Sequence, residues 1–169
     1  MEKTLKKINS LVELGIIRNY AIGGGMGQIY YIEPTVTYDL DVMVHLNTIK
    51  ENDLDPLRLI FDWAKENNYK DVNEYIMIEG MPVQFLPAYN DLVSEAIDNA
   101  NKVEMFNTET FVIKPEYLMA IMVETGRNKD KIRLATFLEQ YKYDKALFEV
   151  ILKKYNLTSK FDDYKAKFQ

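Results

Sequence analysis

Four glycines lie within five positions of the chain, at Gly23, Gly24, Gly25 and Gly27, directly after the apolar segment 20–22. An apolar segment that runs into glycines predicts a buried strand ending in a tight turn, because glycine adopts backbone conformations that other residues avoid. Residues 26–31 suit a short helix behind that turn. Backbone N–H groups at a glycine turn and a helix N-terminus can approach a phosphate closely, so this segment is a candidate phosphate site.

A second strand is predicted over residues 38–44, where the sequence reads Tyr-Asp-Leu-Asp-Val-Met-Val. Side chains two residues apart in a strand point to the same face, so Asp39 and Asp41 should converge while Leu40 faces the core. Two neighbouring carboxylates repel each other unless a cation neutralises them. Mg²⁺ and Mn²⁺ prefer oxygen ligands and keep positions open for phosphate. We therefore expect Asp39 and Asp41 to bind one of these metals.

The remaining pattern divides the chain near residue 113. Before it, helical patterns at 5–15, 55–68 and 91–100 alternate with extended segments at 75–78, 83–86, 103–106 and 110–113. Glu79–Gly80 is typical of a hairpin turn. After Lys114–Pro115, apolar residues recur at helical spacing up to the end of the chain. We predict an α+β core over residues 1–113 and a helical subdomain over 114–169 packed on it.

Composition excludes several kinds of site. The chain of 169 residues has no cysteine and one histidine, His45, which excludes disulfides, thiolate zinc sites and cysteine nucleophiles. A formal net charge of −5 argues against a protein that coats nucleic acid through bulk electrostatics. No stretch approaches the roughly 20 apolar residues that cross a bilayer. The N-terminus lacks an apolar signal core. We expect a cytoplasmic protein with no membrane partner.

The glycine motif and the acidic motif together resemble a known signature. Ile22–Gly23–Gly24, followed about fourteen residues later by Asp39–Leu40–Asp41–Val42, is similar to that of the DNA polymerase β-type nucleotidyltransferase superfamily. Thr37 matches the Thr-x-Asp-hydrophobic-Asp form of bacterial members. Segments 114–118 and 126–130 resemble the helical region of AbiEii-like bacterial nucleotidyltransferases. The resemblance implies a nucleotidyltransferase fold, a small mixed sheet flanked by helices, followed by a C-terminal helical subdomain.

The same resemblance implies transfer of a nucleoside monophosphate from a nucleoside triphosphate to an acceptor hydroxyl. The acceptor stays open among RNA such as tRNA, a protein and a small molecule, and so does the oligomeric state. In this scheme Asp39 and Asp41 ligate two divalent cations. The triphosphate is bound by Gly23, Gly24, Gly25, Thr37, Arg127 and Lys129. The resemblance also implies a role in phage defence or in a toxin–antitoxin pair, with a cognate antitoxin as partner.

One departure from the family pattern divides the interpretation. The family carries a third carboxylate on the next core strand, where this chain has Gln84, and an amide can neither carry charge nor act as a general base. Glu79 lies near that strand but belongs to the predicted turn. Two hypotheses follow: an enzyme in which Gln84 completes a reduced catalytic site, or a catalytically degenerate nucleotide-binding or antitoxin-like module. The charged run 127–133 is either a solvated helix face or a basic lid over the triphosphate.

Overall fold

The computed structural model describes residues 1–32, 37–47 and 55–168, and within them a seven-stranded mixed sheet forms the centre of the molecule. The strands in chain order are β1 (Ile17–Ile22), β2 (Leu40–Leu46), β3 (Lys70–Val72), β4 (Tyr75–Ile78), β5 (Met81–Pro87), β6 (Asn101–Met105) and β7 (Thr108–Val112). Their spatial order is β3-β4-β5-β2-β1-β7-β6. β2 pairs in parallel with β5 and β1 with β7, and the other neighbours are antiparallel.

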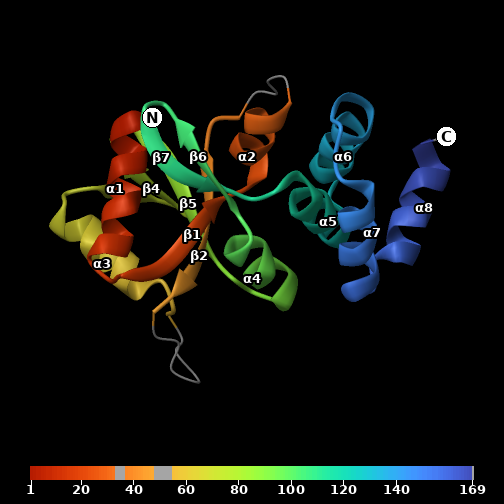
Figure 1. Cartoon of the computed structure of the whole chain (residues 1–169). Helices are drawn as coiled ribbons and strands as arrows, with labels where there is room; N and C mark the ends of the chain where they lie inside the picture. The colour runs from red at the N-terminus through yellow and green to blue at the C-terminus, as the bar shows by residue number, and fades with distance from the viewer. Residues whose placement is uncertain (33–36, 48–54, 169) are drawn as a thin grey trace.

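Helices cover both faces of this sheet. In the first part of the chain they are α1 (Glu2–Glu13), α2 (Gly24–Tyr31), α3 (Arg58–Glu66) and α4 (Asp91–Asp98). The last part is helical, with α5 (Pro115–Thr125), α6 (Asn128–Gln140), α7 (Lys145–Lys154) and α8 (Thr158–Phe168). Figure 1 shows α1 and α3 on one side of the sheet, α2 and α4 on the other, and the last helices stacked beyond them. The predicted α+β class with a helical C-terminal part is confirmed.

Two apolar clusters hold these layers together. One lies between the sheet and α1 and α3, and includes Leu40, Val42 and Val44 of β2. The other joins the opposite face, including Met43, to α4 and the four C-terminal helices. β2 is therefore buried on both faces, which explains its continuous apolar run after Asp41. The predicted boundary at residue 113 falls between β7 and α5, and the division into two domains stays a prediction.

Local signals were accurate at the hairpin and incomplete elsewhere. Glu79 and Gly80 have φ angles of 51° and 82°, as a two-residue hairpin turn with the right twist requires, and they join β4 to β5 as expected. The helix expected from residue 26 instead begins at Gly24. Strand β3 was not predicted, because its three residues are exposed and show no alternation. None of the described helices is long and apolar enough to cross a membrane.

Candidate functional site

The glycine turn and the start of α2 lie against β2. The backbone N–H of Gly23 donates to the carbonyl oxygen of Asp41 at 3.0 Å, and Gly27 N–H closes the first helical turn on the Gly23 carbonyl at 2.8 Å. No side chain among the described residues caps this N-terminus. The first N–H groups of a helix have no partner within it. Of the three glycines expected to bind phosphate, Gly24 and Gly25 therefore offer their N–H groups, whereas that of Gly23 is used by β2.

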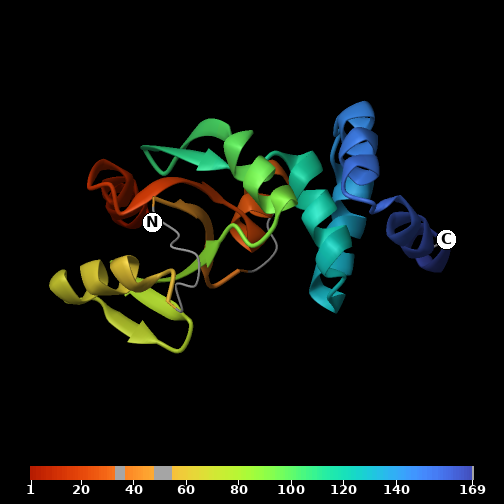
Figure 2. The same cartoon turned by 90° about the horizontal axis from the view of Figure 1, so that it is seen from below.

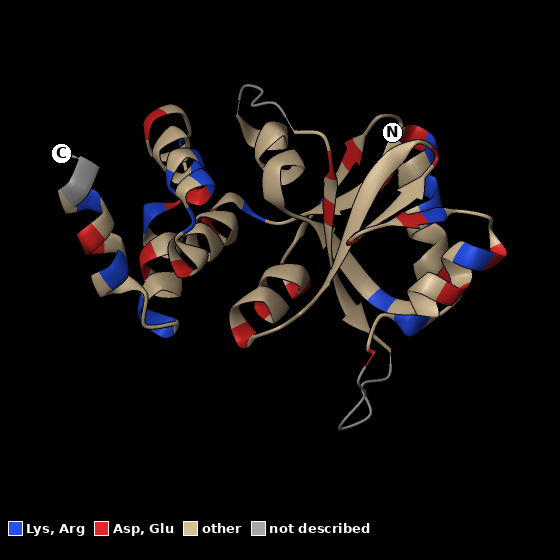
Figure 3. Ribbon diagram, turned by 180° about the vertical axis from the view of Figure 1, so that it is seen from behind, with Lys and Arg blue, Asp and Glu red and all other residues tan. Residues whose placement is uncertain are grey.

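Asp41 faces this turn at very close range. A Cβ atom placed on Gly24 would lie 1.6 Å from Oδ2 of Asp41, so the carboxylate stands directly over the glycine backbone. A Cβ on Gly25 would lie 2.7 Å from the Thr37 hydroxyl oxygen and 2.8 Å from Nη2 of Arg133. Figure 3 shows acidic positions on the strand that runs beside α2. The structure therefore brings the acidic motif, the threonine and the glycine turn into one place, together with an arginine that was not among the expected ligands.

Asp39 is oriented by two hydroxyl groups. Its Oδ1 accepts a hydrogen bond from Thr37 at 2.8 Å, and its Oδ2 accepts one from the Tyr75 hydroxyl at 3.3 Å. A carboxylate has about four lone-pair positions, so Asp39 keeps capacity for a further ligand. Tyr75 comes from β4, and nothing in its local sequence singled it out.

The electrostatics of Asp41 suit a cation-binding group. Burial raises the pKa of the Asp41 carboxyl above its ordinary value, and the nearby charge of Asp39 raises it further. Lys129, Arg133 and Arg127 act in the opposite direction. Within residues 1–32, 37–47 and 55–168, no three or more histidine or acidic side chains gather into a metal site of their own. The two carboxylates fit a Mg²⁺ ion that is also held by a substrate's phosphates and by water, as this metal is commonly bound.

Gln84 occupies the position expected of it. In the parallel register of β2 and β5, Asp41 is paired with Gln84, and paired residues point to the same face of the sheet. The half-buried amide therefore stands beside the Asp41 carboxylate. Glu79 lies at the far hairpin turn, where it accepts a hydrogen bond from the Tyr69 hydroxyl at 2.8 Å. Position 84 thus lies beside the acid pair, but its side chain is an amide and not a carboxylate.

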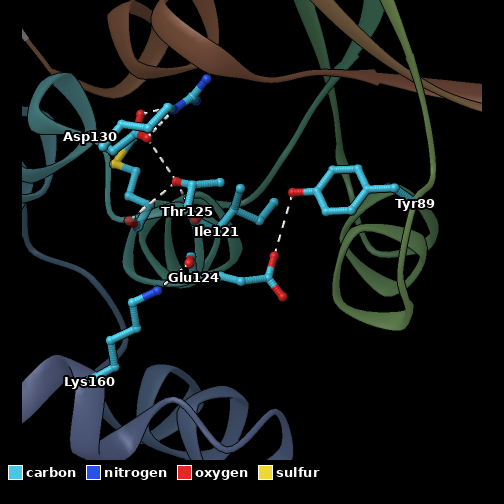
Figure 4. Close-up of polar contacts among 8 residues, drawn as sticks. Tyr89, Ile121, Glu124, Thr125, Asp130 and Lys160 are labelled. Carbon is cyan, nitrogen blue, oxygen red and sulfur yellow. Dashed lines mark hydrogen bonds and ion pairs between the residues drawn. The ribbon is translucent and has the colours of Figure 1, made fainter.

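Three cations of the 127–133 run contribute to the field at Asp41, but their settings differ. Arg127 is held by Asp130, with Nε 2.6 Å from Oδ2, while Asp130 also accepts from the Thr125 hydroxyl at 2.7 Å. Figure 4 shows this group at the end of α5, with Glu124 of the same helix reaching towards Tyr89. Lys129 and Arg133 form no ion pair with another residue in the described part of the chain. These two are the cations available to an anionic ligand.

The architecture is that of the nucleotidyltransferase fold, and solved structures bear this out. The chain is similar to an antigenic nucleotidyltransferase-like protein from Paracoccidioides brasiliensis, with 14% identity, a TM-score of 0.52, and coverage of 96% of this chain and 91% of that one. It is also similar to the antibiotic-resistance factor ANT(2″)-Ia, at 12% identity and a TM-score of 0.50 over 100% of both chains. No family model and no curated protein matches the sequence. At such low identity these likenesses establish the fold alone.

Proposed function

We propose that this protein is a metal-dependent nucleotidyltransferase, which moves a nucleoside monophosphate from a nucleoside triphosphate to an acceptor hydroxyl. The observation that carries the proposal is the position of the Asp41 carboxylate, which lies over the backbone of Gly24 at the open start of α2. A pair of acids and a phosphate-binding turn are thereby parts of one site. Structural likeness to a nucleotidyltransferase-like protein supports the same reading.

The chain's own groups divide the work of binding. The N–H groups of Gly24 and Gly25 and the positive end of α2 would hold the triphosphate, with Lys129 and Arg133 neutralising its charge. Phosphoryl transfer needs positioning and charge neutralisation more than covalent chemistry, and these groups supply both. Arg127 would act mainly through its fixed pair with Asp130, because its guanidinium is already engaged.

The reaction balances without a covalent intermediate on the protein. The acceptor oxygen forms a bond to the α-phosphorus, and the bond from that phosphorus to the bridging oxygen breaks. Pyrophosphate leaves with the electron pair. The hydroxyl proton passes to solvent water, since Gln84 beside Asp41 cannot accept it.

Asp39 and Asp41 would hold the divalent cation, Mg²⁺ or Mn²⁺. When bound, such an ion neutralises phosphate charge and polarises the α-phosphate. Thr37 and Tyr75 fix the orientation of Asp39 by their hydrogen bonds, so this carboxylate is preorganised before any ligand arrives. We extend the proposal to membership of the AbiEii-like group. This membership would bring a defence role, an antitoxin partner and a cytoplasmic location.

Gln84 favours a second candidate function, a catalytically degenerate module that binds nucleotide or a partner protein without turnover. The two candidates share the binding site and differ in one product. Pyrophosphate release from a nucleoside triphosphate separates the enzyme from the binding module.

The experiment is a thermal-shift titration with the four nucleoside triphosphates, with and without Mg²⁺ or Mn²⁺, followed by a pyrophosphate assay. Ligand binding stabilises by about 2.7 kcal/mol at a hundred times the dissociation constant. Asp41→Asn should abolish the metal-dependent part of the shift. Asp62→Asn, an exposed acid on α3, should leave it unchanged. A shift that needs no metal and survives Asp41→Asn would overturn the proposed site.

A further inference from the structure

An uncovered apolar surface runs along the sheet to the acid pair. Residues paired across strands share a face, and the registers of β3 to β5 pair Val72 with Tyr75 and Met77 with Pro82. Two residues beyond Pro82 on the same face stands Gln84, which is paired with Asp41. This face therefore leads from the β3 edge directly to the carboxylates. We call it the hairpin face.

The hairpin face is open, unlike the other side of the same strands. Ile76, Ile78 and Val83 point to the opposite side and are buried in the core under α1 and α3. Val72 is half exposed, at 50%, and Tyr75 is partly exposed. Figure 2 shows the β3–β4 hairpin and α3 at one end of the molecule, away from the C-terminal helices. Solvated sheet faces usually carry polar side chains, so an apolar one beside a reactive site indicates a ligand surface.

A pocket of about 400 Å³ lies over this face and reaches Asp39. Its lining includes Tyr38, Asp39, Tyr75, Met77, Pro82 and Arg133. The volume falls within the range of about 300–1,000 Å³ that is usual for small-molecule sites. Tyr38 is 82% exposed, an unusual setting for an aromatic ring that has no ligand to cover it. The pocket thus combines aromatic and apolar walls, a carboxylate at one end and a guanidinium.

The position of the pocket relative to the glycine turn assigns its role. In an in-line displacement, the acceptor and the departing pyrophosphate lie on opposite sides of the α-phosphorus. Gly24 meets Asp41, which places the triphosphate on that side of the acid pair. Asp39 accepts a hydrogen bond from the Tyr75 hydroxyl and lines the pocket on the hairpin side. Thr37 and Arg133 line the pocket and also lie 2.7 Å and 2.8 Å from the Cβ position of Gly25, so the pocket adjoins the phosphate site. A hydroxyl in the pocket would reach the reacting phosphorus from the Asp39 side, whereas the triphosphate is held on the Gly24 side.

We propose that the pocket on the hairpin face receives the acceptor, and that this acceptor is a nucleoside whose ribose hydroxyl reaches Asp39. The inference rests on the proposed function for its reaction, but not for the binding itself. A base stacks on the rings of Tyr38 and Tyr75, which tolerate any base because each has a flat face. Arg133 stands at the border between the pocket and the triphosphate site, because it lines the pocket and also lies beside Gly25. The nucleotide is either free or the terminal residue of an RNA strand.

Fluorescence of 2-aminopurine tests binding without requiring turnover, because stacking on an aromatic ring quenches it. The probes are 2-aminopurine riboside monophosphate and a short single-stranded RNA ending in 2-aminopurine. We expect quenching of at least one probe, and a dissociation constant about tenfold higher in Tyr38→Ala. Phe106→Ala removes another exposed ring, 52% accessible, at the opposite edge of the sheet between β6 and β7, and should change nothing. Tyr75→Phe keeps the ring and should keep the quenching.

The same assay distinguishes the acceptor site from a site for the base of the triphosphate. A saturating concentration of a non-hydrolysable ATP analogue, added together with Mg²⁺, should leave the probe bound. Displacement of the probe by the analogue would overturn the assignment. Equal binding by wild type, Tyr38→Ala and Phe106→Ala, or no binding of either probe, would also overturn it. If both probes are quenched, the acceptor is a free nucleotide. If only the RNA probe is quenched, the acceptor is the end of a strand. If the probe is quenched but no pyrophosphate is released from a nucleoside triphosphate, the proposed function is contradicted and the pocket assignment is not.

Discussion

The carboxylate of Asp41 occupies the space that a Cβ atom on residue 24 would need, with Oδ2 only 1.6 Å from that position. Gly24 also has a φ angle of +54°, a left-handed conformation that side chains with a Cβ rarely adopt. Glycine is therefore required here for two independent reasons. The backbone turn needs it, and so does the acid that stands over the turn.

Gly24→Ala should lose metal-dependent nucleotide binding, because the new methyl group displaces Asp41. Gly80→Ala is a matched control: Gly80 has a φ angle of +82°, but no atom lies within 4 Å of its Cβ position. Both variants should lose about 1–2 kcal/mol of unfolding free energy to the left-handed backbone. Only Gly24→Ala carries the clash. Urea unfolding and the metal–nucleotide thermal shift measure the two effects, and normal nucleotide binding by Gly24→Ala would contradict the geometry.

Gln84→Asp should raise turnover, because it restores a carboxylate directly beside Asp41. A general base contributes roughly a hundredfold or more in favourable cases, so we expect a gain on the order of tenfold or more in pyrophosphate release. Without metal the variant should unfold more easily than wild type, since three acids then repel one another. Gln84→Asn keeps a neutral amide and should show no gain. An unchanged rate in Gln84→Asp would remove the argument from the third carboxylate.

The parts of the site that the sequence predicted depend on local signals. A strand ending in glycines and an alternating Asp-x-Asp strand each report on neighbouring residues, so Gly24, Asp39 and Asp41 could be placed before any fold was known. Gln84 could be placed as well, because strand alternation gives its face. The pairing register, which puts it beside Asp41, comes from the folded sheet.

The parts that the sequence did not predict depend on long-range packing. Tyr75 reaches Asp39 from 36 positions further along the chain, through a hairpin whose edge strand has no alternating pattern. Arg133 was one of several charges in the run 127–133, and only the packing of α6 near Gly25 distinguishes it. Arg127 matched a motif, yet its guanidinium is bound by Asp130 three residues away.

Asp130→Asn should lower the free energy of unfolding. Burial alone would raise the pKa of Asp130, but hydrogen bonds from Arg127 and Thr125 outweigh it and hold the pKa below its ordinary value. Asp130 is only 2% exposed, so the variant leaves polar groups at the start of α6 poorly paired. We expect a loss of about 1–3 kcal/mol in chemical denaturation. Asp162→Asn breaks an exposed pair with Lys165 and should cost at most about 1 kcal/mol. Equal losses in the two variants would show that the buried pair contributes nothing special.

Glu95 on α4 joins three helical segments and should make stability depend on pH. It accepts hydrogen bonds from the hydroxyls of Tyr117 and Tyr155 and pairs with Lys154. Burial alone would raise the pKa of Glu95, but these three partners lower it from 4.5 to about 2. A carboxyl whose pKa is lower in the folded state adds stability above its unfolded pKa, and that stability is lost as pH falls towards the folded pKa.

Glu95→Gln should therefore be less stable than wild type by about 1.5–3 kcal/mol near neutral pH, the usual size for hydrogen bonds to a charged group. The difference should shrink as pH falls from 4.5 towards about 2, because wild-type Glu95 then becomes protonated as well. Urea unfolding of both proteins at several pH values between neutrality and that limit gives the curve. Glu109→Gln, which breaks an exposed pair with Lys102 across β6 and β7, is the control and should shift stability by about 1 kcal/mol or less. A difference between Glu95→Gln and wild type that stays constant throughout this range would mean that the charge of Glu95 does not hold α4, α5 and the end of α7 together.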